Sequence, residues 1–338
     1  MRTLGLCCAV IVFGLGFCGA ESAGAATATS DGLSIGTPRV VYDGDFPDPS
    51  TLFVGGTYYA YSTNVDGENL PVMSSSDLVH WQRLGDAMAF LPSWAADLSG
   101  FTWAPSVAAA PSGGYEAFFS TLDTNGEECI GRAVAPSPTG PFLDTSPSPL
   151  ICSDHQGAID PSVFRTAAGD FLVWKADTGK DQPGEIFAQR LSQLDSSLIG
   201  SPAVLLTASQ GWEDGIVEGP ALADIGGHLD LFFSANRWDT SHYAIGLTTC
   251  TSPLGPCDQA DTHVVLSSQP GMAGPGGPDV FVGQDRDFLV FSAWTDGSPG
   301  GTGSRRALFV SVLSTGGALA AATSAGSTRT VTRERGSQ

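Results

Sequence analysis

Three carboxylates lie beside prolines at separate places in this chain, and their residue types fit acid–base chemistry. Asp48 and Asp160 each directly precede a proline, and Glu218 lies two residues before one. Proline fixes its own φ and pushes the preceding residue out of the helical region, so we expect Asp48 on a stiff, extended backbone. Where carboxylates converge in a cleft, mutual repulsion raises the pKa of some and leaves that of others low. One acid can then donate a proton while another activates water.

The prolines beside these acids belong to a fivefold repeat. Each proline introduces a short apolar segment, a turn and an aromatic-rich segment, which is the pattern of a β-hairpin. Five such units at a nearly fixed period, with no helical pattern between them, predict an all-β fold, a five-bladed β-propeller. The repeated prolines are Pro49, Pro105, Pro161, Pro220 and Pro278, at intervals of 56, 56, 59 and 58 residues.

The propeller predicts where the acids meet. Its innermost strands face the central axis, and their beginnings at one end surround the mouth of the channel. Asp48, Asp160 and Glu218 mark such beginnings in blades one, three and four, so we expect their carboxylates to converge. A single aspartate before a proline is more often an ordinary turn residue. Three acids in register with the repeat instead favour glycoside hydrolysis, which uses one protonated and one ionised carboxyl group.

Five elements of the sequence, taken in order, resemble glycoside hydrolase family 43, and the resemblance covers residues 38–313. It implies a five-bladed propeller that cleaves arabinofuranosidic or xylosidic bonds with inversion. By position, it implies Asp48 as the general base, Glu218 as the general acid, and Asp160 as the residue that tunes the pKa of the acid and orients it. Room for the attacking water requires the base and the acid to lie about 6.5–9.5 Å apart. The five elements are Phe46–Ser50, Ser76–Trp81, Trp103–Val107, Gly157–Phe164 and Val217–Pro220.

Aromatic residues beside the acids would supply the surface that faces the sugar. We expect three of them to wall the pocket or to stack on an apolar sugar face, with Trp103 as the best candidate. Arg306 resembles a family arginine that reaches into the pocket from blade five. Trp174 and Trp294 are expected to pack between blades instead. The three aromatic candidates are Phe46, Trp103 and Trp212.

These features predict an inverting glycosidase that acts on arabinose- or xylose-containing plant polysaccharide. An α-L-arabinofuranosidase is preferred, with a β-xylosidase or an endo-arabinanase of the same family as alternatives. A carbohydrate-binding propeller without catalysis is an alternative of a different class, although a binding module has no need for three converging acids. Related five-bladed enzymes that cleave fructans are disfavoured, because the different motif of their covalent nucleophile is not found.

Blade five departs from the family pattern. Many members have a histidine in a Gly-Pro-Gly-His element, often beside a central ion or water, whereas this chain reads Gly-Pro-Gly-Gly over residues 274–277. No other histidine is an obvious substitute, so we expect no cofactor, and a central calcium ion is doubtful. The histidines of the chain are His80, His155, His228, His242 and His263.

Composition and charge exclude several kinds of partner. The chain has 338 residues, of which 42% are hydrophobic and 15% charged, and the repeat assigns most of them to one domain. The net charge of −20 disfavours nucleic acid and anionic lipid, since both need a basic footprint. A neutral carbohydrate partner is compatible with this charge, and a monomer is expected.

The two ends of the chain differ from the repeat. Residues 1–25 predict a signal peptide, with a basic start, an apolar centre and a small-residue cleavage site, so the protein is expected to be secreted. Anchoring as a lipoprotein through Cys18 is less favoured, because bulky Phe17 precedes it. Residues 26–37 are expected to be a flexible lead-in, and residues 314–338 a mostly disordered tail.

Four cysteines remain once the signal peptide is removed, an even number in an oxidising compartment. Cys250 and Cys257 bracket a short turn, and Cys129 and Cys152 flank a loop with a similar Ser-Pro-x-Gly-Pro element. We therefore predict disulfides 129–152 and 250–257. A metal site at these cysteines is disfavoured, because no histidine lies at ligand spacing from them.

Overall fold

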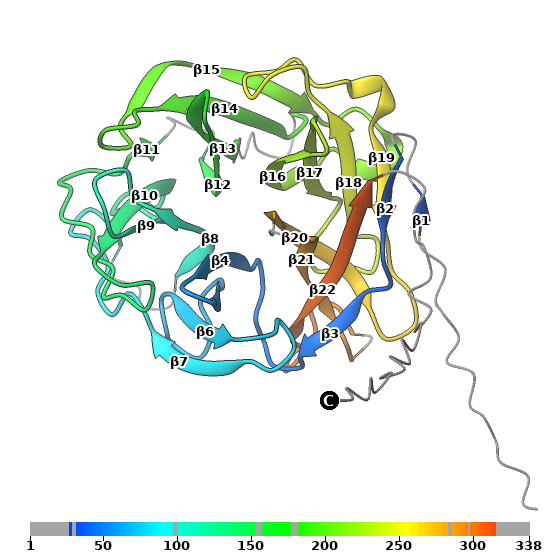
Figure 1. Cartoon of the computed structure of the whole chain (residues 1–338), viewed down its shortest axis with the longest axis horizontal. Coiled ribbons are helices and arrows are strands. Elements are labelled where there is room, and N and C mark those ends of the chain that lie inside the picture. Colours follow the sequence, from blue (N-terminus) through cyan, green and yellow to red (C-terminus); the bar gives the residue numbers. More distant parts are fainter. Residues whose placement is uncertain are drawn as a thin grey trace, which may run out of the picture.

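A computed structural model describes residues 27–28, 32–96, 101–152, 157–176, 182–282, 286–296 and 298–315. Five antiparallel sheets stand around a central axis, each as one blade (Figure 1). The predicted five-bladed β-propeller is therefore confirmed. Blade one consists of β4 (Ser50–Val54), β5 (Thr57–Tyr61), β6 (Pro71–Ser75) and β7 (Gln82–Asp86). Blade two consists of β8 (Thr102–Ala109), β9 (Tyr115–Leu122), β10 (Glu128–Ala135) and β11 (Ile151–Cys152).

The remaining three blades follow in chain order. Blade three consists of β12 (Ile159–Thr166), β13 (Gly169–Ala176), β14 (Glu185–Leu191) and β15 (Leu198–Thr207). Blade four consists of β16 (Val217–Ile225), β17 (His228–Ala235), β18 (Ala244–Thr249) and β19 (His263–Leu266). Blade five is built from β20 (Ala273–Val282), β21 (Asp287–Trp294) and β22 (Arg306–Thr315), joined by β3 (Arg39–Tyr42), β2 (Leu33–Ile35) and β1 (Thr27–Ala28).

The aromatic-rich segments of the repeat form the second strand of each blade. This strand lies inside its sheet, and the two faces of the sheet pack on the two neighbouring blades, so apolar residues suit both faces. In blade three, all eight residues of β13 are buried. The innermost strands β4, β8, β12, β16 and β20 surround the centre of the ring (Figure 1).

The N-terminal segment closes the ring. β3 pairs with β22, with Val40 opposite Phe309, so blade five combines the two ends of the domain. β2 also pairs with β22, and Leu33 and Ile35 on β2 are each only 2% exposed in the core. The lead-in expected to be flexible is therefore ordered over this strand, because its two apolar side chains cover blade five.

Other expectations for the ends fall on residues outside the described part. These are the signal peptide of residues 1–25 and residues 316–338 of the tail predicted for residues 314–338. The first two residues of that predicted tail, Ser314 and Thr315, belong to β22. In the part of the chain that the structure describes, no helix is long and apolar enough to cross a membrane.

Side-chain oxygens link neighbouring blades around the channel. Ser50 Oγ of blade one accepts from the N–H of Val107 in blade two at 3.0 Å. Asp279 performs this role between blades five and one, since its Oδ2 accepts from both N and Oγ1 of Thr51 at 2.7 and 2.6 Å. The ring is thus closed by a carboxylate on its inner side and by β3 on its outer side.

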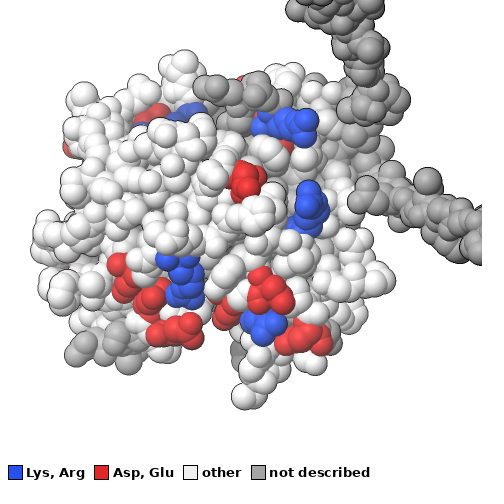
Figure 2. All heavy atoms as spheres, turned by 60° about the horizontal axis from the view of Figure 1, so that its bottom comes forward, with Lys and Arg blue, Asp and Glu red and all other residues white. Residues whose placement is uncertain are grey.

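Charged side chains are sparse on the surface. On the face drawn in Figure 2, lysine and arginine side chains lie singly among acidic and uncharged residues and form no broad basic patch. This distribution agrees with the net charge of −20.

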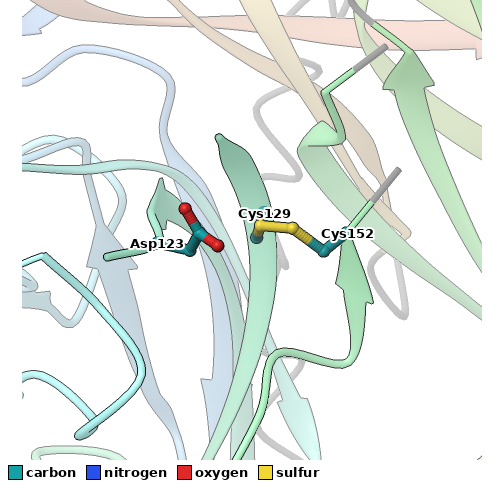
Figure 3. Close-up of side chains that lie close together, drawn as sticks. All are labelled: Asp123, Cys129 and Cys152. Carbon is teal, nitrogen blue, oxygen red and sulfur yellow. A yellow bond between two sulfur atoms is a disulfide. The ribbon is translucent and has the colours of Figure 1, made fainter. Parts of the chain in front are cut away.

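Both predicted disulfides are present. Cys129 on β10 is bonded to Cys152 on β11 (Figure 3), which ties the outer edge of blade two. Cys250 is bonded to Cys257 across the turn that follows β18. The sequence pairing 129–152 and 250–257 is confirmed.

Candidate active site

The residue before each repeated proline has a left-handed backbone, which turns the innermost strand at the mouth of the channel. The expected extended backbone at Asp48 is therefore wrong. Proline disfavours the right-handed helical region for the preceding residue. In blades two to five the strand pairing also shifts at this point, as at a β-bulge. Residues with a left-handed backbone cost roughly 1–2 kcal/mol when they carry a Cβ and cluster at functional sites. The φ angles are 49° at Asp48, 40° at Ala104, 55° at Asp160, 52° at Gly219 and 60° at Gly277.

A cavity of about 630 Å³ opens at this mouth, and all five blades contribute to its lining. Asp48, Asp160 and Glu218 all line it, so the expected convergence of the three acids is observed. The volume suits a ligand of a few sugar units, because small-molecule sites span about 300–1,000 Å³.

Asp48 is held by a fork of hydrogen bonds. Arg306 donates from Nη1 to Oδ1 at 2.8 Å and from Nη2 to Oδ2 at 3.2 Å. The hydroxyl of Thr63 donates to Oδ2 at 2.7 Å. A bidentate guanidinium fixes both the position and the plane of a carboxylate, so Asp48 is aimed by its partners as well as by its backbone.

The guanidinium of Arg306 is itself held by two indole rings. Its Cζ lies 5.2 Å from the ring centroid of Trp238 and 5.9 Å from that of Trp294. Both distances are within the range of a cation–π interaction. Arg306 therefore lies in the cavity, as the sequence predicted, between a carboxylate and an aromatic wall.

Glu218 has a different pair of partners. Lys175 on β13 donates from Nζ to Oε2 at 2.9 Å, and Tyr243 donates from its hydroxyl to Oε1 at 2.7 Å. The Lys175 and Glu218 side chains are only 10% and 12% exposed. Burial, and then the negative charges of Glu218 and Asp48, raise the pKa of Tyr243 well above its usual value. Tyr243 therefore remains a protonated donor.

Asp160 differs from the other two acids because it forms no ion pair with any lysine or arginine in the described part of the chain. Its Oδ2 accepts from the N–H of Gly219 at 2.8 Å. Burial raises the pKa of Asp160 to about 7, repulsion by Glu218 adds to this, and the charge of Lys175 opposes it. The site thus has two ion pairs, Asp48 with Arg306 and Glu218 with Lys175, and a third acid that takes up a proton near neutral pH.

The aromatic residues proposed from the sequence have different locations. Trp103 lines the cavity and contacts Phe101 edge-on, with 5.8 Å between the ring centroids. Phe46 is fully buried in the core, edge-on to Tyr42, and does not line the cavity. A sugar contact at Phe46 is therefore ruled out for this arrangement.

Trp212 also lies outside the cavity lining. It belongs to a short 3-10 helix, Gly211–Glu213, and its ring packs on Phe233, with 5.8 Å between the ring centroids. Its closeness to Glu218 in the sequence does not bring it to the cavity, because the helix covers the core of blade four. The assignment of Trp212 to sugar binding is corrected in the same way.

Five residues whose side chains contact the carboxylate of Asp48 or Glu218 or the guanidinium of Arg306 were not assigned to the site from the sequence. Trp174 does pack between blades two and three, as expected. Trp294 was expected to do the same, but it lines the cavity beside Trp238. Nothing in the sequence pointed to Trp238, which follows β17 in a loop. The five residues are Thr63, Lys175, Trp238, Tyr243 and Trp294.

The sequence did contain a signal for Lys175. By register, Ser120, Ser234 and Ser292 occupy the corresponding position in blades two, four and five. Each pairs with the residue two before the repeated proline, as Lys175 does with Ile159 in blade three. The lysine at this position indicates that blade three uses the position differently from the blades that have serine there.

Metal ligands are few in the described residues. One group of three potential ligands lies within 4.8 Å: Asp123, Cys129 and Cys152 (Figure 3). The two sulfur atoms are bonded to each other, which leaves no thiolate for a metal. Asp123 accepts from the N–H groups of Asn125 and Glu127 at 2.8 and 2.9 Å. This group is a disulfide beside a turn, and no described histidine lines the cavity.

The sequence was compared with known protein families. The profile of glycosyl hydrolases family 43 matches residues 37–313. The chain belongs to this family. The family predicted from the sequence is thereby confirmed, and the match spans the propeller from β3 nearly to the end of β22.

Relatives in family 43 include proteins of several described activities. "Arabinoxylan arabinofuranohydrolase" of Bacillus subtilis is 30% identical over 188 residues, which is 47% of this chain and 36% of the relative. "Extracellular endo-alpha-(1->5)-L-arabinanase" of Thermotoga petrophila is 27% identical over 204 residues, 47% of this chain and 42% of the relative. The matched part thus spans less than half the length of either relative.

A solved family-43 structure supports the same conclusion. The crystal structure of a thermostable family-43 glycoside hydrolase superimposes with a TM-score of 0.71 and 26% identity. The match covers 86% of this chain and 96% of that structure. The agreement over nearly the whole solved chain confirms the family-43 propeller.

Proposed function

We propose that this family-43 chain hydrolyses arabinofuranosidic or xylosidic bonds in plant polysaccharide with inversion, most simply as an α-L-arabinofuranosidase. The observation that carries the proposal is the pairing of Asp48 with Arg306 and of Glu218 with Lys175 and Tyr243 in one cavity. Inverting hydrolysis needs two carboxyl groups in distinct environments on opposite sides of the scissile bond. The names of two relatives both refer to arabinose-containing substrates, which favours this sugar.

In the proposed reaction, Asp48 removes a proton from a water molecule as the water attacks the anomeric carbon. Arg306 and Thr63 hold the Asp48 carboxylate in place for this step. Glu218 gives a proton to the departing oxygen. The two protons balance, because the one gained by Asp48 equals the one lost by Glu218, and exchange with solvent restores both groups.

Asp160 is proposed to regulate the proton on Glu218. The charge of Glu218 repels a charge on Asp160 in this buried site and adds to the raised pKa of Asp160. In the site without substrate the proton is on Asp160, because its pKa is raised to about 7, mainly by burial. When Glu218 holds the proton, the ionised Asp160 helps to keep it there until the leaving group takes it.

The partner that this chemistry requires is a neutral carbohydrate. The net charge of −20 and the sparse basic side chains argue against nucleic acid as a substrate. The two disulfides support export to an oxidising compartment, and one relative is named as extracellular. We therefore propose that the protein acts outside the cell.

The test is sugar release from arabinoxylan, linear arabinan and xylo-oligosaccharides, resolved by chromatography. We expect D48N and E218Q to lower the rate by about 10²–10⁴-fold, the usual contribution of an acid–base group. D195N is a matched control, because Asp195 is an exposed acid in the β14–β15 turn. NMR of the first product anomer measures inversion. Near-wild-type rates in D48N or E218Q, or a retained anomer, would contradict the assigned roles.

A further inference from the structure

An exposed indole stands at the edge of the cavity. Trp238 lines the cavity, yet its side chain is 48% exposed, the largest exposure of any described tryptophan. An exposed indole gains little from folding, because its apolar face is not removed from water. Tryptophan commonly occupies such positions where one face receives a ligand.

The exposed ring is held in a fixed orientation. Trp238 stacks on Trp294, with 6.0 Å between the ring centroids and 23° between the planes. Trp294 Nε1 also donates to the carbonyl oxygen of Trp238 at 3.1 Å. Arg306 contacts both rings. A ligand that meets this ring therefore finds it already ordered and loses little entropy in binding it.

The loop that carries Trp238 is also fixed. Arg237 and Asp239, on either side of it, form a two-point ion pair with distances of 3.1 and 2.8 Å. Ser268 Oγ donates to the carbonyl oxygen of Ser241 at 2.6 Å. The loop ends at Tyr243, whose hydroxyl contacts Glu218. One short segment thus positions both the exposed indole and the proposed acid.

Trp238 lies beside the reaction centre rather than within it. Arg306 stands between them, with its Nη atoms on Asp48 and its Cζ 5.2 Å from the Trp238 ring centroid. The sugar whose bond is cleaved must lie close to Asp48, with the attacking water between them. A further unit of the same chain would then extend past Arg306 and over the indole.

We propose that Trp238 is a stacking platform for a second sugar unit, so that it makes an oligosaccharide a better substrate than a single sugar on a small aglycone. The proposal rests on the proposed glycosidase function and names a residue that determines its substrate specificity. The apolar C–H face of the second unit lies on the indole. Trp294 supports the platform from behind, and Arg306 links it to Asp48.

The test compares two kinds of substrate. The first is a glycosyl fluoride of arabinofuranose or xylose, which has one sugar and a one-atom leaving group. The second is the matching three-unit oligosaccharide. We expect W238A to lower kcat/KM for the oligosaccharide at least tenfold more than for the fluoride, mainly through KM. W238F, which keeps an aromatic face, should recover most of this difference.

The control is F53A. Phe53 is another exposed aromatic residue, 40% exposed, on β4 and outside the cavity lining. F53A should leave the ratio of the two kcat/KM values at the wild-type level. Equal losses on both substrates in W238A would overturn the proposal, since Trp238 would then act only by supporting Arg306. Wild-type kcat/KM values of W238A on both substrates would overturn the proposal as well.

A binding measurement separates this proposal from the proposed function. If the wild-type protein hydrolyses neither substrate, the glycosidase assignment fails. Binding of the three-unit oligosaccharides, monitored by intrinsic tryptophan fluorescence, then tests the role of Trp238 as a platform independently of hydrolysis. Binding that is at least tenfold weaker in W238A supports the platform, and equal binding by wild type and W238A overturns it.

Discussion

Lys175 takes the position of the repeat serine in blade three, and its ammonium group donates to Glu218 at 2.9 Å. In blades two, four and five, the serine hydroxyl at this position accepts from the backbone of the next blade, at 2.9 Å for Ser120, 2.8 Å for Ser234 and 3.3 Å for Ser292. The lysine instead reaches a side chain of the next blade. One substitution in the repeat therefore turns a link between blades into an ion pair in the cavity.

Replacing this lysine should change the pH dependence of the reaction. In K175M, a positive charge that opposes the raised pKa of Asp160 is lost. We expect the basic limb of the kcat/KM profile to move to higher pH, and the rate at its optimum to fall about 10–100-fold because Glu218 loses a donor. K175R keeps the charge and should keep the limb. A K175M profile with an unmoved limb would mean that Lys175 only fills space.

Asp160 should make folding less favourable as the pH rises. The pKa of Asp160 is about 7 in the folded chain, against a usual value of 3.8. Between these two values the folded state binds more protons than the unfolded state, so the contribution of Asp160 to stability is lost from about pH 4 to pH 7. In D160N the melting temperature should depend less on pH over this range. At pH 8 the variant should melt a few degrees higher than wild type.

The same variant tests the role of Asp160 in the reaction. D160N removes the negative charge that helps to keep a proton on Glu218. We expect the limb of the kcat/KM profile near pH 7 to shift, with a lower maximum rate. An unchanged profile would show that Asp160 does not tune the acid, even if the predicted change in stability is found.

The fold could be predicted because its signal is periodic. One proline occurs at the same point of each unit, so five prolines at a nearly constant period indicated the innermost strands, the channel and the blade of each acid. The backbone conformation before the proline was not predicted correctly, because Asp48 has a positive φ. The order of the blades follows from chain order. The three acids could therefore be assigned to the channel from residue spacing.

The aromatic wall could not be predicted in this way. Phe46 is two residues before Asp48, and in a regular strand both would point to one face. The left-handed φ of 49° at Asp48 breaks that alternation, so Phe46 enters the core while Asp48 enters the channel. Trp238 lies in a loop outside the repeat, and its position depends on its stacking against Trp294. No sequence period encodes that contact.

Asp279 should be important for closing the ring. In D279A, the N–H and hydroxyl of Thr51 would lose their shared acceptor, and an unpaired buried donor costs about 1–3 kcal/mol. D279N keeps an acceptor oxygen and should be milder. The free energy of unfolding from urea titration measures both variants. S106A, which removes the single bond at 3.0 Å to the Val163 N–H, is the comparison from an ordinary blade junction. Equal losses in D279A and D279N would argue against the hydrogen bonds.

The burial of Asp279 adds a pH dependence to this junction. Burial raises the pKa of Asp279 to about 6. The folded state therefore binds the proton more tightly than the unfolded state between about pH 4 and pH 6, and stability from this group declines as the pH rises through that window. In D279N that decline should be absent, which a series of melting temperatures from pH 4 to pH 7 would reveal. A D279N series parallel to wild type would contradict the assignment.

Ala104 provides a separate test of the left-handed turn. Blade two has alanine before its repeated proline, with φ of 40°, where blades four and five have glycine. A Cβ is unfavourable in this region and glycine is not, so A104G should raise the free energy of unfolding by about 0.5–1 kcal/mol. The control is A108G on the same strand, where φ is not positive and glycine should destabilise the protein by a similar amount. Opposite signs for the two variants would show that the turn at the mouth of the channel is a strained element. Destabilisation by both would mean that contacts of the Ala104 methyl group outweigh the backbone strain.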